Sequence, residues 1–75
     1  MLEALGRRIE ILLKGEAIHF YVENNKLLAS FDTRNGLVIE VLTPFEIKLL
    51  EQGKYTDDDV KRKALELKQI ANFTL

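Results

Sequence analysis

Hydrophobic and polar residues alternate along the first half of the chain. From Arg8 to Lys14, one side would carry Ile9, Ile11 and Leu13, and the other Arg8, Glu10, Leu12 and Lys14. The same period recurs in three later segments, Ala17 to Glu23, Lys26 to Thr33 and Leu37 to Leu42. A period of two is typical of β-strands, because successive side chains point to opposite faces of a sheet. The pattern therefore predicts four strands.

Short polar segments separate these predicted strands. Gly15-Glu16 and Asn24-Asn25 fit two-residue turns, since glycine and asparagine tolerate a positive φ. Arg34-Asn35-Gly36 fits a three-residue loop whose glycine is left-handed. Each strand should therefore pair with the next one along the chain.

These turns fix a register that keeps the apolar residues together. They place Phe20 opposite Ala29 and Phe31 opposite Ile39. We therefore expect a four-stranded antiparallel β-meander with one apolar face, made of Ile9, Ile11, Leu13, Ile18, Phe20, Val22, Leu27, Ala29, Phe31, Leu37, Ile39 and Val41.

The first fourteen residues also fit a helix. Leu2, Leu5, Ile9 and Leu12 recur at helical spacing, and Gly15 is suited to follow a last helical turn. The alternative fold is therefore an N-terminal helix, a three-stranded meander and two helices.

Two helices are expected after Leu42. Thr43-Pro44-Phe45-Glu46 supplies an N-cap, an early proline and a capping-box glutamate, and Gly53 supplies a stop. A second helix should begin at Thr56, capped against Asp59, with one apolar stripe of Val60, Ala64, Leu67, Ala71 and the adjoining Ile70. Both should cover the apolar face of the sheet. The fold class is thus α+β, a four-stranded antiparallel β-meander followed by two helices packed on one face, in one small domain over residues 1–75.

The amino-acid composition excludes several classes of metal site. The 75 residues include no cysteine and one histidine, and the net charge is -1. Thiolate and multi-histidine metal sites are therefore excluded, and we expect no metal and no cofactor. Asp57-Asp58-Asp59 is typical of a first helical turn rather than of a cation site, and Lys61-Arg62-Lys63 of a solvated, paired face. Abundant Glu, Lys, Ile and Leu favour a thermophilic source.

One row of side chains resembles catalytic parts. The predicted register puts His19 opposite Ser30, and Ser30 opposite Glu40. Such a row would lie in mid-strand on an open face, without an oxyanion donor or a glycine-rich elbow beside it. We therefore interpret it as a solvated polar row and expect no enzymatic activity.

Apolar side chains are also expected on the outer face of the sheet, away from the predicted core. They are Tyr21, Leu28, Val38, Leu42 and Leu12. Of these, Tyr21, Leu28 and Leu42 should share one cross-strand row. A cluster of this kind on a small domain suggests a contact surface, unless Met1 to Leu5 or the tail Phe73-Thr74-Leu75 covers it. We therefore predict a non-enzymatic protein-interaction module. It would form a homo-oligomer, namely a dimer, or dock a larger protein, through the outer face or an edge strand.

The alternative function is a nucleic-acid accessory protein that binds RNA or single strands. Its contacts on the outer face would be Arg8, Lys14, His19, Tyr21 and Lys26. Acidic residues share that face and cancel much of the positive field. No apolar run approaches the roughly 18 residues of a membrane span, so we expect a cytoplasmic protein with no membrane partner.

Overall fold

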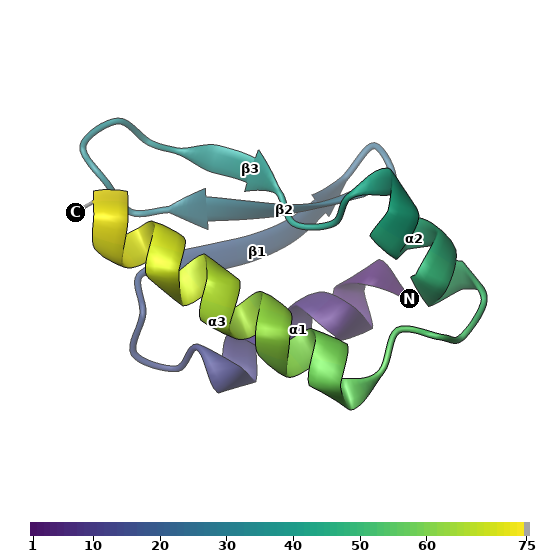
Figure 1. Ribbon diagram of the computed structural model, residues 1–75. Helices are drawn as coiled ribbons and strands as arrows, with labels where there is room; N and C mark the ends of the chain where they lie inside the picture. The colour runs from purple at the N-terminus through teal and green to yellow at the C-terminus, as the bar shows by residue number, and fades with distance from the viewer. Residues whose placement is uncertain (75) are drawn as a thin grey trace.

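Three helices and three strands follow one another in the computed structural model, which describes residues 1–74 (Figure 1). Their bounds are Leu2–Leu12 for α1, Ile18–Glu23 for β1, Lys26–Phe31 for β2, Val38–Glu40 for β3, Pro44–Glu51 for α2 and Asp57–Thr74 for α3. The α+β class and the antiparallel meander are confirmed. The fourth strand is absent from this range, and the alternative fold with an N-terminal helix is correct.

The predicted first strand, Arg8 to Lys14, is wrong because most of this segment belongs to α1. Ile9 and Leu13 are buried, whereas Ile11 between them is 73% exposed. Burial at every fourth residue follows the helical period, and Leu5 extends it toward the N-terminus. Ile9 and Leu13, four residues apart, share a face in a helix and in a strand alike, and only packing distinguishes the two structures.

Two glycines determine how α1 meets the sheet. At Gly6 a Cβ atom would stand 3.1 Å from Cδ1 of Leu27 and 3.6 Å from Cβ of Phe20, so glycine allows the helix to approach closely. Gly15 has a φ of 95° and lies in the loop after α1. The predicted strand-to-strand turn at Gly15-Glu16 is therefore a helix-to-strand connection.

β1 and β2 form the predicted hairpin. Asn24 and Asn25 have φ values of 53° and 61°, the left-handed backbone of a type I′ turn. Phe20 lies opposite Ala29, as the two-residue loop requires. The register predicted for this hairpin is confirmed along the whole pair.

The pairing of β2 with β3 differs from the prediction by two residues. Ile39 lies opposite Ala29 rather than Phe31, and the Phe31 N–H donates to the Leu37 carbonyl at 2.8 Å. The loop between β2 and β3 is therefore longer than the predicted three-residue loop. Within it, the Gly36 N–H donates to the Thr33 carbonyl at 3.1 Å. A shift of two preserves which face each side chain points to.

Both C-terminal helices begin at the predicted caps. The Thr43 hydroxyl accepts from the Glu46 N–H at 3.2 Å, and the Glu46 carboxylate accepts from the Thr43 N–H at 2.9 Å. Thr56 and Asp59 make the same reciprocal pair at 3.3 and 2.8 Å. These capping boxes satisfy backbone donors that the helices leave open. Gly53, with a φ of 70°, follows α2 as predicted.

One core lies between the sheet and the helices. α1 and α3 lie along the same face of the sheet, and α2 lies beside the end at which β3 leaves it (Figure 1). The buried residues are Leu5, Ile9, Leu13, Ile18, Leu27, Ala29, Phe31, Val41, Leu42, Val60, Ala64, Leu67 and Ala71. Phe20, Val22, Leu37 and Ile39 are only half-buried. Because α1 and α3 share one face, no helix of residues 1–74 covers the other face of the sheet.

Candidate functional site

The outer face of the sheet carries two cross-strand rows. The register places Tyr21 opposite Leu28, and Leu28 opposite Glu40. In the next row His19 lies opposite Ser30, and Ser30 opposite Val38. The predicted row of His19, Ser30 and Glu40 is therefore wrong, because the two-residue shift of β3 moves Glu40 beside Leu28.

Three of the predicted contact residues adjoin on this face. Tyr21 is 39% exposed and Val38 is 46% exposed, while Leu28 between them is half-buried. Val38 is a diagonal neighbour of Leu28, within reach across adjacent strands. We call Tyr21, Leu28 and Val38 the outer-face patch.

The other two predicted contact residues lie elsewhere. Leu42 is only 5% exposed and belongs to the core, because the chain bends after β3 and turns both Val41 and Leu42 inward. Leu12 is exposed, but on α1, and so on the side of the sheet that the helices cover. The row of Tyr21, Leu28 and Leu42 therefore does not form.

The segments considered as covers leave the outer-face patch open. Met1 to Leu5 leads into α1 on the inner face, with Leu5 in the core. Phe73 is largely exposed at the end of α3, and Leu75 lies outside the described residues. Neither covering segment is thus observed within residues 1–74.

The cationic set predicted for nucleic acid is divided between two sides. Arg8 lies on α1 and pairs with Asp57 at the start of α3, and Lys14 follows α1. His19, Tyr21 and Lys26 do share the outer face, where Lys26 pairs with Glu40 at 3.0 Å. The structure therefore does not bring the five residues together.

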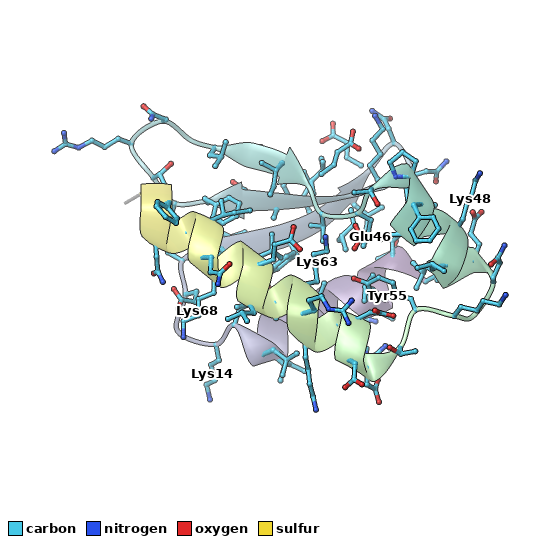
Figure 2. The ribbon with its side chains drawn as sticks, viewed as in Figure 1. Lys14, Glu46, Lys48, Tyr55, Lys63 and Lys68 are labelled. Atoms are coloured by element: carbon cyan, nitrogen blue, oxygen red, sulfur yellow. The ribbon has the colours of Figure 1, made fainter. Side chains whose placement is uncertain are left out.

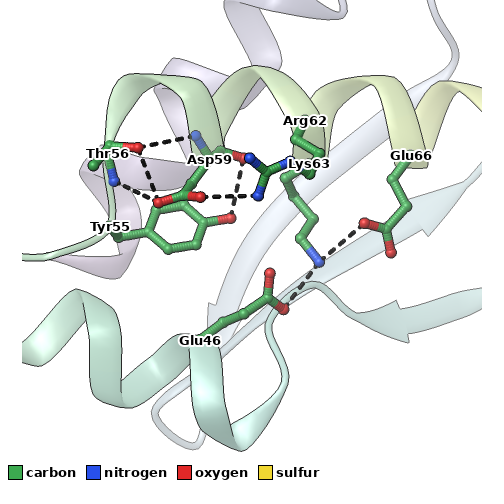
Figure 3. Close-up of polar contacts among 7 residues, drawn as sticks. All are labelled: Glu46, Tyr55, Thr56, Asp59, Arg62, Lys63 and Glu66. Carbon is green, nitrogen blue, oxygen red and sulfur yellow. Dashed lines mark hydrogen bonds and ion pairs between the residues drawn. The ribbon is translucent and has the colours of Figure 1, made fainter.

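The sequence interpretation missed a buried cation. Lys63 is 5% exposed, and its Nζ lies 3.0 Å from Oε1 of Glu46 and 3.5 Å from Oε2 of Glu66 (Figure 3). The predicted solvated face of Lys61-Arg62-Lys63 is wrong at this position. Lys63 stands three residues after Val60 and four before Leu67, on the apolar stripe of α3. This spacing could have predicted from the sequence that Lys63 is buried.

Two groups around Lys63 have shifted pKa values. Burial acts to raise the pKa of Glu46, but hydrogen bonds from Thr43 and Lys63 outweigh it and hold the pKa below its ordinary value. Burial, together with the negative charges of Glu46 and Asp59, raises the pKa of Tyr55 to about 12. Figures 2 and 3 show these side chains gathered between α2 and α3. The charges are paired with one another, so the cluster fastens α2 to α3.

A groove of about 510 Å³ lies between the start of α1, the β1–β2 turn and α2. Its walls are mostly apolar, and its polar side chains are Glu3, Asn25, Lys26, Glu40 and Glu51. These include no nucleophile paired with a base. Within residues 1–74 no three histidine or carboxylate side chains are grouped as metal ligands would be.

Comparisons with known proteins assign no function. No family model, no curated protein and no solved structure matches this chain. Among the helices of residues 1–74, none has the length and apolar character needed to cross a membrane.

Proposed function

We propose that this chain is a non-enzymatic protein-interaction module that self-associates through the part of its sheet that the helices leave open. The observation that carries the proposal is the open part of the sheet, where β1 has a free edge and where the outer-face patch, Tyr21, Leu28 and Val38, lies on a face that no described helix covers. Single exposed apolar residues need no explanation, whereas adjoining ones on a small domain mark contact surfaces. A domain of this size also gains stability from a partner.

The open part of the sheet consists of two regions. One is the outer-face patch, and the other is the free edge of β1, which has no neighbouring strand within residues 1–74. Leu28 lies on the middle strand, at the centre of the patch and away from the β1 edge. A substitution at Leu28 therefore disturbs the outer-face patch without disturbing the β1 edge, and so distinguishes a contact at one region from a contact at the other.

The polar groups support this function over catalysis or nucleic-acid binding. Ser30 faces Val38 instead of a carboxylate, so no relay of acid, base and hydroxyl is assembled. Lys26 is neutralised by Glu40, and Arg8 lies on the helical side. We expect the module to act in the cytoplasm, on a protein partner rather than a phosphate backbone.

Sedimentation equilibrium tests the proposal directly. At micromolar and higher concentrations, we expect a mass twice that of the chain, and a monomer mass at every concentration would contradict self-association. Leu28→Lys then locates the contact, because it dissociates a dimer built on the outer-face patch and leaves a dimer built on the β1 edge intact. Ile11→Lys is the matched control, an exposed apolar residue on α1. Dissociation by the control variant would place the contact on the helices and refute the proposal.

A further inference from the structure

β1 is an edge strand whose outward backbone groups are unpaired within residues 1–74. The Asp32 N–H donates to the Ala17 carbonyl at 3.0 Å, which makes this pair a hydrogen-bonded one. Hydrogen-bonded and non-bonded positions alternate along an antiparallel pair. The observed register therefore turns the N–H and C=O groups of Ile18, Phe20 and Val22 away from β2.

The inner-face side chains along this edge are apolar, and two of the three are incompletely covered. Phe20 and Val22 point to the inner face, yet both are only half-buried. A groove of about 160 Å³ lies beside them, between β1 and the side of α1 that carries Glu3, Gly6, Arg7 and Glu10. The core of the domain thus ends at β1 without a lateral wall.

The two edges of the sheet differ in how well they resist strand addition. β3 spans only Val38–Glu40, and a short edge strand offers few backbone groups. β1 spans Ile18–Glu23, and it has no proline and no charged residue pointing inward. Soluble proteins use such features to block pairing with other chains. β1 is therefore the edge to which a strand can be added.

We infer that β1 pairs antiparallel with β1 of a second copy, about a twofold axis at Phe20, so that the two sheets become one. The inference rests on the proposed function, since it names the region of the open sheet that the second copy occupies. An isologous contact of this kind closes on itself and yields a dimer.

The sequence of β1 complements itself in this register. Ile18 lies opposite the partner's Val22 and Phe20 opposite the partner's Phe20, so the outward backbone groups of both strands face one another. All inner-face neighbours are apolar, and on the outer face His19 meets the partner's Tyr21. Within the two strands, no like charges are opposed. A shift by two residues in either direction leaves fewer of the outward groups paired.

The outer-face patch offers a weaker contact than this edge. Tyr21 and Val38 are more exposed than Phe20 and Val22, but the Lys26–Glu40 ion pair borders Leu28 on the same face. Burying that pair against a second sheet would cost desolvation of both charges. Pairing at β1 instead supplies partners to backbone groups and extends the cover of Phe20 and Val22.

Proline substitutions test the edge. Val22→Pro removes an outward N–H, which a free edge strand tolerates, but it places the proline ring where the second strand must pair. We expect the dissociation constant of the dimer to rise on the order of 30-fold or more, because two hydrogen bonds are lost per dimer. Glu40→Pro is the matched control, since it removes an outward N–H on β3 at a residue outside the outer-face patch, and we expect it to leave the dimer intact. Far-UV circular dichroism checks that both variants fold.

A pair of exposed double variants tests the register without a proline. His19→Glu with Tyr21→Glu sets like charges opposite each other across the axis, whereas His19→Lys with Tyr21→Glu sets opposite charges there. We expect the first to be monomeric and the second to dimerise. A Val22→Pro dimer as tight as the wild type, or equal masses for the two double variants, would overturn the inference. A monomeric wild type would instead refute the proposed function itself.

Discussion

Glu46 holds α2 and α3 together through one carboxylate oxygen. Its Oε1 accepts from the Thr43 backbone N–H at 2.9 Å, and it lies 3.0 Å from Nζ of the buried Lys63. Replacing Glu46 by alanine removes the carboxylate half of the capping box, although the Thr43 hydroxyl still caps the N–H of residue 46, and it leaves Lys63 with Glu66. We expect this substitution to be among the most destabilising single changes outside the apolar core.

The magnitude follows from the two contacts. Loss of a capping interaction costs about 1 kcal/mol. A hydrogen bond between charged groups contributes roughly 1.5 to 3 kcal/mol, and we take about 1.5 here because Glu66 remains beside Lys63. Glu46→Ala should therefore lower the free energy of unfolding by about 2.5 kcal/mol. Glu46→Gln keeps an oxygen for the cap and should lose about 1.5 kcal/mol.

Urea unfolding followed by far-UV circular dichroism, at neutral pH and fixed protein concentration, measures both changes. Glu51→Ala is the control, because Glu51 is exposed on the same helix and should change stability by no more than about 0.5 kcal/mol. If Glu46→Ala were no more destabilising than Glu51→Ala, the role of the Glu46–Lys63 contact would be refuted.

Three further predictions use the same assay. Because the pKa of Glu46 is lowered in the folded protein, its contribution is present above its ordinary pKa of 4.5 and lost as the pH falls through the folded value. The stability difference between wild type and Glu46→Gln should accordingly shrink in acid, and a constant difference would contradict the assignment. Ile9→Ala should cost about 2 to 5 kcal/mol and Ile11→Ala less than about 0.5, because only Ile9 is buried; equal losses would argue against the packing of α1. Asn25→Gly should stabilise the protein by roughly 0.5 kcal/mol, since glycine adopts the positive φ of this type I′ turn more readily, and a loss of stability would count against that turn.

Local chemistry made several elements predictable. The capping boxes at Thr43 and Thr56 each depend on two residues three apart, and the hairpin depends on a pair of asparagines. Such interactions form within a few residues of chain, so the sequence carries them fully. In the first fourteen residues one set of apolar positions fitted a strand and an overlapping set fitted a helix, so the pattern did not distinguish the two structures.

Contacts between residues far apart in the chain were harder to predict from the sequence. A shift of β3 by two residues keeps every side chain on its face, so the alternation of apolar residues has the same form in both registers. Lys63 contacts Glu46, which lies on a different helix. From its residue type alone, Lys63 was expected to be exposed to solvent. The misplaced Leu42 shows the same limit, because a bend that follows a strand turns a side chain inward without any change in the pattern.

By itself, the sequence determined the hairpin, the helix caps and the polarity of each strand face, because these arise from neighbouring residues and from the fixed period of the backbone. Only the tertiary structure decided which surfaces are left open. The packing of α1 against the sheet made β1 an edge strand and placed Leu12 and Arg8 on the helical side. The exposure of a surface depends on what the rest of the chain covers, and that is a property of the assembled fold.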